Sequence, residues 1–187
     1  MSLKDTAKAA LGRLLADYRI NWIYAGGPWC AGRKAELEVA PIDAAMAELL
    51  AASPTAKMRN SLSYTRGGLT GLVLVENGKP VCVSHVADPA HYDRSATWPL
   101  RANEVAVMDL ATEDALKGRG LAVQLMQATT STHLAHGKSR VIAFIWWNNT
   151  PSVRAVTKAG WRRIGLSIEV QIARKWFALR LPLPLPP

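Results

Sequence analysis

Leu110-Ala-Thr-Glu-Asp-Ala-Leu-Lys-Gly-Arg-Gly-Leu-Ala122 is the stretch of the sequence that decides the fold. It predicts the end of a strand, a short loop and the first turn of a helix. The first N–H groups of a helix have no partner within the helix and lie at the positive end of its dipole, where they bind phosphate groups. Gly118 and Gly120 let the backbone approach an anion without an intervening Cβ atom. The stretch therefore predicts a site for a ligand that carries phosphate.

Four motifs spaced along the chain resemble those of the GNAT acyltransferase superfamily. The loop Lys117-Gly-Arg-Gly-Leu-Ala122 resembles the family's pyrophosphate motif, Arg/Gln-x-x-Gly-x-Gly/Ala, with lysine in the first place. Leu110-Ala-Thr112 fits the strand end Leu-x-Val, with threonine in place of valine. Asn149-Thr-Pro-Ser152 resembles the Asn-x-x-Ser/Ala loop, and Lys158-Ala-Gly-Trp161 resembles the Lys-x-Gly-Phe that ends a short helix. The resemblance covers roughly residues 70 to 170 and implies an acyl-CoA N-acyltransferase.

Other nucleotide-binding motifs fit the chain less well. It has no Gly-x4-Gly-Lys-Ser/Thr, which excludes a Walker-type phosphate loop. Val123 stands where a dinucleotide fingerprint has its third glycine, and no acidic residue stands out at the end of a following strand.

Length and composition favour a single domain without a membrane span. We expect one domain over residues 1–180 and an extended Leu/Pro tail over residues 181–187. A hydrophobic content of 49% and a charged content of 20% are typical of a soluble globular protein. Apolar runs such as residues 141–147 are too short to cross a bilayer, and the first residues lack the apolar core of a signal peptide. Cys30 and Cys82 are too few for a disulfide scaffold or a zinc site, so we expect no metal and a cytoplasmic location.

The net charge of +9 bears on possible partners. The basic residues are spread along the chain with no run of five or more, which favours general solvation and a phosphate site over nucleic-acid binding. The surplus would also suit an acyl carrier protein with an acidic surface. A homodimer stays open.

The pattern of apolar residues predicts an order of helices and strands. Asn77-Gly78 between two apolar runs is the strongest hairpin signal. The tail should be extended and unable to donate to a sheet. The order αβαββ-β-αβαββ is that of the GNAT fold, an α/β fold with a central mixed, mostly antiparallel sheet flanked by helices. The expected elements are a helix over 3–18, a strand over 19–25, a helix over 41–52, a polar, mobile loop over 53–69, strands over 72–76 and 80–86, a loop over 87–103, a strand over 104–111, a helix over 120–136, a strand over 140–147, a helix over 152–159, and strands over 162–171 and 174–179.

The resemblance also implies which residues hold acetyl-CoA, the expected acyl donor. Backbone groups of Leu110, Ala111 and Thr112 would hydrogen-bond the pantetheine arm along a strand that splays from its neighbour. One N–H there would polarise the thioester carbonyl. Asn149, or the adjacent Asn148, would contact the pantetheine amides. The residues expected at the phosphates and at the following loop are Lys117, Gly118, Arg119, Gly120, Leu121, Ala122 and Ser152.

A base is expected because an alkyl amine, with a pKa of about 10.4, is almost entirely protonated at pH 7. Family bases lie at even offsets before the terminal leucine of the strand, and period-two alternation places Met108, Ala106 and Glu104 on one face. Only Glu104 of these can titrate, so it is the first candidate. Asp109 should point to the other face and make a structural hydrogen bond. His85 on the hairpin is the second candidate base.

Several aromatic and loop residues have less specific roles. His91, Tyr92 and Asp93 lie in a loop that could cover the acceptor. Trp146 and Trp147 are expected to be a buried and a half-buried strand residue.

One departure from the family pattern leaves the function open. Val156 occupies the position of a tyrosine that protonates the departing thiolate in many members. Ser152 or Tyr92 could replace it, or the thiolate could leave unaided, since a thiol has a pKa of only about 8.5. The first expected function is transfer of an acetyl group to a primary amine of a small molecule or peptide, directly in a ternary complex. The alternatives are a longer-chain acyltransferase using acyl-CoA or acyl carrier protein, and a non-catalytic acyl-CoA sensor.

Overall fold

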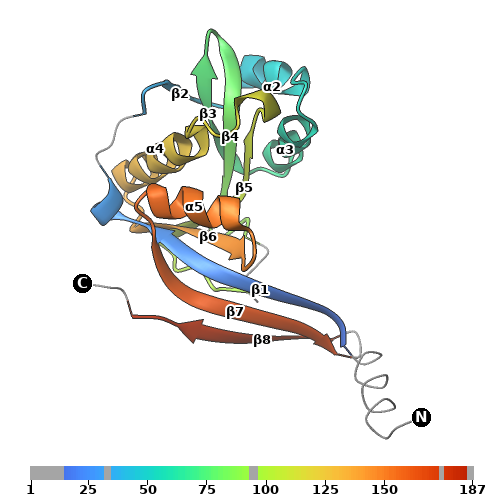
Figure 1. The fold of residues 1–187 in the computed structure, drawn as a ribbon. Helices are drawn as coiled ribbons and strands as arrows, with labels where there is room; N and C mark the ends of the chain where they lie inside the picture. The colour runs from blue at the N-terminus through green and yellow to red at the C-terminus, as the bar shows by residue number, and fades with distance from the viewer. Residues whose placement is uncertain (1–14, 32–34, 93–96, 173–174, 185–187) are drawn as a thin grey trace, which may run out of the picture.

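An eight-stranded sheet forms the centre of the protein (Figure 1). The structure, a computed structural model, describes residues 15–31, 35–92, 97–172 and 175–184. The strand order is β2-β3-β4-β5-β6-β1-β7-β8, and every neighbouring pair is antiparallel except β5 and β6. This order confirms the expected α/β class with a mixed, mostly antiparallel sheet. The strands are β1 (Leu15–Gly26), β2 (Glu38–Pro41), β3 (Thr70–Glu76), β4 (Lys79–Ala87), β5 (Glu104–Thr112), β6 (Arg140–Trp146), β7 (Arg162–Ile172) and β8 (Lys175–Pro182). The helices are α2 (Ala44–Ala51), α3 (Ala56–Arg66), α4 (Leu121–Ala135) and α5 (Thr150–Lys158), with short 3₁₀ helices η1 (Pro28–Cys30) and η2 (Asp114–Leu116).

Helices cover both faces of the sheet (Figure 1). Met126 of α4 and Val156 of α5 share one buried apolar cluster with the sheet, and we call this side the α4–α5 face. Leu50 of α2 and Val83 of β4 share another cluster on the α2–α3 face. The connection over residues 87–103 continues this second face. Among the described residues, no helix is both long and apolar enough to cross a bilayer.

The hairpin predicted from Asn77-Gly78 is confirmed. β3 and β4 pair antiparallel, and the two turn residues have φ values of 52° and 72°. Positive φ at both central positions is the conformation of a type I′ turn, which matches the twist of the strands that it joins.

The segment over residues 53–69, expected to be a mobile loop, forms a helix instead. α3 begins after Thr55, and its buried side chains Met58, Ser61 and Leu62 face the sheet. Their spacing of three and four residues is helical. The helix escaped the sequence analysis because polar side chains fill the positions between them, so the segment has little overall hydrophobicity.

The second helix begins later than expected, because Pro41 is the last residue of β2. β2 lies at the edge of the sheet, where a strand tolerates a residue without an N–H. α2 begins after Asp43, whose carboxylate accepts a hydrogen bond from the N–H of Met46 at 2.8 Å.

β1, from the start of the chain, lies between β6 and β7, which come from its end. Most of the helix expected over residues 3–18 falls on residues 1–14, outside the described part of the chain. Leu15 to Tyr18, however, belong to β1 and not to a helix. Beyond the end of β6, β1 continues with β7 and β8 as a three-stranded extension that projects from the helices, and we call it the outer sheet (Figure 1).

The Leu/Pro tail takes part in the sheet. Leu181 and Pro182 are the last residues of β8, and the N–H of Leu183 donates to the carbonyl of Ile164 at 2.8 Å. The expectation that the tail donates to no sheet was wrong, because the leucines between the prolines keep their N–H groups.

Candidate active site

The sheet opens between β5 and β6. The two strands run parallel, and their pairing begins at Glu104 opposite Arg140 and ends at Val107 opposite Ala143. β5 nevertheless continues to Thr112 and β6 to Trp146. Backbone groups along the later part of β5 can therefore pair with an extended ligand, as they would with a strand.

A β-bulge in β5 marks the start of this opening. His85 of β4 lies opposite Asp109, but the next residue, Val86, lies opposite Val107. Met108 is therefore the extra residue, and a bulge of this kind bends its strand and changes the direction of the side chains that follow.

Because of the bulge, some side chains of β5 lie on a different face of the sheet from the one that strict alternation predicted. Ala106 and Met108 pack on the α2–α3 face, but Leu110 packs on the α4–α5 face. Asp109 lies opposite His85, and two residues later Ala111 packs against α2 and α3. Met108 and Asp109 therefore lie on the same face. Asp109 was expected to point away from it.

The loop after β5 presents free N–H groups to solvent. Gly118 and Gly120 have φ values of 87° and 78°, and no heavy atom lies within 4 Å of the Cβ that either would carry. Gly120 is the N-cap of α4 and no side chain caps the helix. The first backbone bond of α4 runs from Gln124 to Gly120, so among the described residues the N–H groups from Gly118 to Val123 have no acceptor. Leu121 and Ala122 belong to this first turn.

Carboxylates hold the two cationic side chains of the loop. The ammonium of Lys117 lies 2.5 Å from Asp114, and the guanidinium of Arg119 donates to both oxygens of Glu76 at 2.9 and 2.6 Å. The side chains of Lys117, Asp114 and Arg119 are largely exposed and that of Glu76 is 25% exposed, and pairs so open to solvent contribute little to stability. The backbone N–H groups are thus the polar groups of this loop that are free to bind a ligand.

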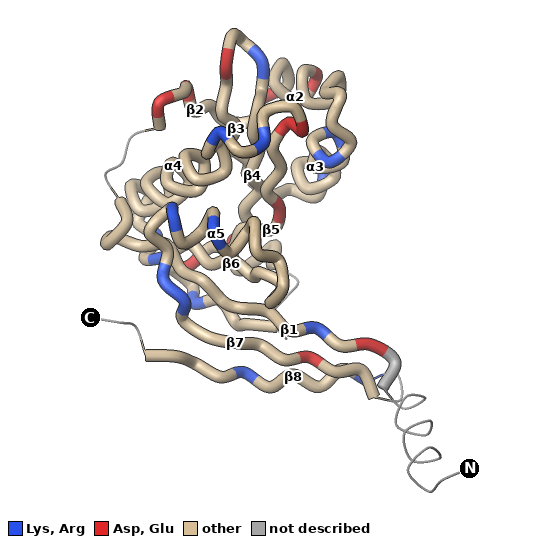
Figure 2. Tube along the Cα trace, viewed as in Figure 1, with Lys and Arg blue, Asp and Glu red and all other residues tan. Residues whose placement is uncertain are grey.

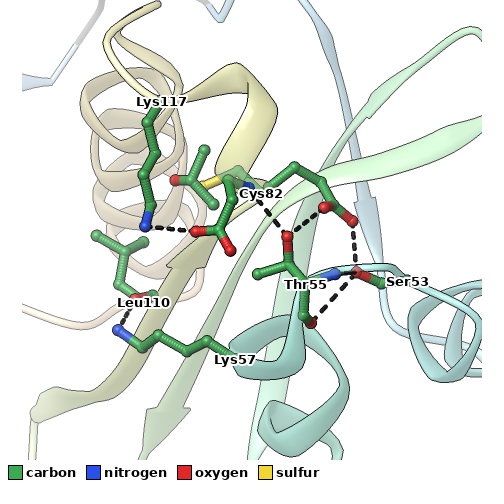
Figure 3. Close-up of polar contacts among 9 residues, drawn as sticks. Ser53, Thr55, Lys57, Cys82, Leu110 and Lys117 are labelled. Carbon is green, nitrogen blue, oxygen red and sulfur yellow. Dashed lines mark hydrogen bonds and ion pairs between the residues drawn. The ribbon is translucent and has the colours of Figure 1, made fainter.

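A set of hydroxyl groups fixes the end of β5 to the start of α3 (Figure 3). Ser53 and Thr55 each donate a hydrogen bond of 2.5 Å to the carboxylate of Glu113. The hydroxyl of Thr55 also accepts the N–H of Asp114 at 2.9 Å. These contacts join the loop that follows β5 to the α2–α3 layer.

Lys57, in the first turn of α3, reaches the opening itself (Figure 3). Its ammonium donates to the carbonyl of Leu110 at 2.7 Å and lies 3.8 Å from a carboxylate oxygen of Asp109. Burial raises the pKa of Asp109, and the nearby ammonium of Lys57 opposes that rise. The bulge, which the sequence of β5 does not indicate, places Asp109 on this face beside Lys57.

Glu104 lies at the far end of β5 from the glycine loop and is only 1% exposed. Its carboxylate accepts two hydrogen bonds from the guanidinium of Arg140 and one, at 3.0 Å, from the N–H of Arg101. Both oxygens therefore have cationic or N–H partners. This arrangement gives Glu104 a structural role and does not favour the role of base.

His85 is fully buried on β4. Its Nε2 lies 2.8 Å from the hydroxyl of Thr65, and its Nδ1 has no hydrogen-bond partner among the described residues. Burial lowers the pKa of His85 to about 4, so the ring is neutral at pH 7. A group with so low a pKa and no solvent access is a weak proton acceptor.

The Asn149 loop begins α5. The side-chain oxygen of Asn149 accepts the N–H of Ser152 at 3.2 Å, so this residue caps the helix, and Asn148 beside it is exposed. Val156 is 2% exposed and packs in the core with Tyr24 and Trp161. A tyrosine at that position would not fit without repacking of the core.

Of the loop residues expected to cover the acceptor, one is packed in the core and one is exposed to solvent. The hydroxyl of Tyr92 donates to the carbonyl of Trp98 at 2.7 Å, and its ring stacks on Phe144. His91 is exposed and paired with Asp88, and Asp93 lies outside the described residues.

The two tryptophans at the end of β6 are more exposed than expected. Trp146 is the half-buried last residue of the strand, and Trp147 follows the strand and is 48% exposed.

The chain resembles known proteins in part of its sequence and in its fold. The sequence matches the family model described as FR47-like protein over residues 90–170. No curated protein matches the chain by sequence.

Solved structures share the fold at low sequence identity. An acetyltransferase of the GNAT family from Colwellia psychrerythraea has a TM-score of 0.55 at 14% identity, over 96% of this chain and 62% of its own. A GCN5-related N-acetyltransferase from Sphaerobacter thermophilus has a TM-score of 0.55 at 14% identity, over 97% of this chain and 57% of its own. The aminoglycoside N-acetyltransferase AAC(6')-Iy, in complex with CoA, has a TM-score of 0.53 at 14% identity, over 67% of this chain and 92% of its own. The protein spans less than two thirds of the first two chains, and its fold is that of the GNAT acyltransferases.

Proposed function

We propose that the protein is an acyl-CoA-dependent N-acyltransferase that takes acetyl-CoA as donor and a primary amine as acceptor. The observation that carries this proposal is the opening between β5 and β6, which leads directly to the uncapped helix start at Gly120. An extended chain with a pyrophosphate at one end fits these two features together. Acyl-CoA thioesters have that form.

The backbone would hold the donor. The N–H groups around Gly118 and Gly120 would bind the pyrophosphate, since they are free and lie at the positive end of α4. Strand β5 after the bulge would pair with the pantetheine amides, and Asn149 lies at the end of α5 that borders the opening. When bound, the donor supplies an activated acyl group. An N–H of β5 directed at its carbonyl would stabilise the developing oxyanion.

The ammonium of Lys57 donates a hydrogen bond to the carbonyl of Leu110, which is one of the groups expected to bind the pantetheine. Its side chain is 64% exposed and can swing away at little cost. Donor binding would therefore replace this contact.

Asp109 is the group that we assign as proton acceptor for the amine. It lies beside the bulge, on the α2–α3 face, and its carboxyl has a pKa raised by burial. A carboxylate with a raised pKa is a better base near neutral pH than an ordinary one.

Direct transfer of the acyl group to the amine is favoured because the cysteine near the site is a poor nucleophile. Cys82 is fully buried and hydrogen-bonded to Thr112, and burial raises the pKa of its thiol to about 11. The thiol is therefore protonated at neutral pH and is a poor nucleophile. Attack by the amine itself, in a ternary complex, needs no such intermediate.

The proposal is tested by incubating the protein with acetyl-CoA and a panel of primary amines, and by following both free CoA and the acetylated amine by mass spectrometry. Equal amounts of CoA and N-acetyl product, dependent on the protein, would support it. Tight binding of acetyl-CoA without product from any amine would support the sensor function instead.

A further inference from the structure

A cavity of about 350 Å³ lies where β6 ends and β1 continues into the outer sheet. This volume is at the lower end of the range of small-ligand pockets. Its walls come from three strands and the connection before β5. The lining residues are Asp17, Tyr18, Arg19, Asn21, Thr97, Trp146 and Glu169.

Glu169 is the deepest charged group of this cavity, and it is only 6% exposed. One carboxylate oxygen accepts a hydrogen bond of 2.5 Å from the hydroxyl of Thr97. The other has no hydrogen-bond partner among the described residues and is not among the fully buried atoms, so it opens toward the cavity. A carboxylate removed from water with a single neutral partner favours a cationic ligand.

A second unpartnered polar group lies beside Glu169. Ser167 precedes it by two residues, so both side chains lie on the same face of β7. Ser167 is fully buried and its hydroxyl has no partner among the described residues. It lies opposite Asn21, which lines the cavity.

The rest of the lining also suits an organic cation. Asp17 adds a second carboxylate, and the rings of Tyr18 and Trp146 lie 6.1 Å apart at the cavity wall. Aromatic rings attract ammonium groups through their electron-rich faces. Figure 2 shows acidic positions on both β1 and β7 in the outer sheet. Arg19 lies opposite Glu169 in the pairing of β1 with β7, but its guanidinium lies over the ring of Trp176, at 4.5 Å from its centroid, and forms no ion pair with Glu169 among the described residues. Two carboxylates against one guanidinium contrast with the protein's net charge of +9.

The cavity lies on the side of the sheet where the acyl group is needed. Asn21 shares a face with Ile23, which packs with Met108 and Phe144 on the α2–α3 face. The glycine loop leads into α4 on the opposite face. Trp146, which lines the cavity, lies on β6 three residues beyond Ala143, the last residue that pairs with β5.

We infer that this cavity binds a second, cationic group of the acceptor, apart from the amine that reacts at Asp109, with its ammonium at Glu169 and beside the ring of Trp146. The inference rests on the proposed function, because only an acyltransferase has an acceptor. Asp17, the second carboxylate of the lining, adds to the attraction for a cation. The acceptor class is thus an amine that carries a second positively charged group, and not an amine with an anionic or neutral remainder.

Isothermal titration calorimetry on the full chain, saturated with CoA, measures this binding without turnover. The probes are n-hexylamine and hexan-1-ol, which have nearly the same shape and differ in charge. The wild type should bind the amine at least about tenfold more tightly than the alcohol. Glu169→Gln, which can still accept the hydrogen bond from Thr97, should remove at least about tenfold of the amine affinity. Glu48→Gln, at an exposed position of α2, should leave it unchanged.

Equal affinity for amine and alcohol, no measurable binding of the amine, or full amine affinity in Glu169→Gln would overturn the inference. If Glu169→Gln does not fold, as judged by circular dichroism, Asp17→Asn takes its place with an expected loss of a few-fold. Amine binding that depends on Glu169 but leads to no turnover would contradict the proposed enzymatic function and would still support a cation site in the cavity. If the protein turns over an amine and Glu169→Gln does not raise the KM for that amine, the proposed function stands and the inference about the cavity is contradicted.

Discussion

Val107 lies opposite Ala143 in the last residue pair that joins β5 to β6. The next residue of β5, Met108, is the bulge, and beyond it the two strands separate. The proposed donor site therefore begins where the parallel pairing fails, and the same bulge turns Asp109 toward the α2–α3 face.

Glu104→Gln should lower stability and spare catalysis. The variant leaves the guanidinium of Arg140 without its buried carboxylate, and breaking such a pair costs about 3 kcal/mol. Urea denaturation measures the loss, with Glu38→Gln at an exposed position of β2 as control. A variant of unchanged stability, with a rate loss that recovers at high pH, would return Glu104 to the role of base.

Asp109→Asn should reduce kcat by about a hundredfold or more at neutral pH, the usual contribution of a positioned base, with acetyl-CoA affinity nearly intact. The carboxylate is the active form, so the rate should rise with pH through the pKa of Asp109. Lys57→Met removes a positive charge that lowers this pKa. The acidic limb of the pH–rate profile should therefore move to higher pH in that variant. An acidic limb that stays in place would show that Asp109 does not control the rate.

His85 should make the protein less stable in mild acid. Its pKa is lowered from 6.5 to about 4 in the folded state, so between these values the unfolded chain binds more protons. Stability is then lost as the pH falls below 6.5, by about 2 kcal/mol between pH 7 and pH 5. Denaturant unfolding of the wild type and of His85→Gln across this range measures the effect. The pH dependence should be weaker in the variant, and equal slopes would contradict the prediction.

The local signals in the sequence were sufficient for much of the fold. Asn77-Gly78 fixed one hairpin, since only a few turns accept two residues with positive φ. Gly120 and Gly137 bracketed α4 within one or two residues, because both lie in the left-handed conformation that glycine adopts freely.

Features that depend on tertiary contacts were out of reach. The bulge at Met108 arises from pairing with β4 and leaves no mark in the sequence of β5. The partner of Glu104 is Arg140, thirty-six residues away. α3 owes its existence to burial of Met58 and Leu62 against the sheet more than to its own composition.

Val156 illustrates the same limit for function. The resemblance to the GNAT family places it where many members carry a tyrosine. Burial of the side chain in the core means that Val156→Tyr would overpack the protein. An acid for the thiolate, if one is needed, must come from another residue.

The most direct test of the donor site compares Gly120→Asp with Gly120→Asn by calorimetric titration with acetyl-CoA. Asn and Asp both tolerate the left-handed φ of 78°, have nearly the same size, and differ in charge. Gly120→Asp should weaken binding at least about a hundredfold, because its carboxylate would lie beside the pyrophosphate, and Gly120→Asn should weaken it less than about tenfold. Equal affinities of the two folded variants would contradict the assignment of this loop as the pyrophosphate site.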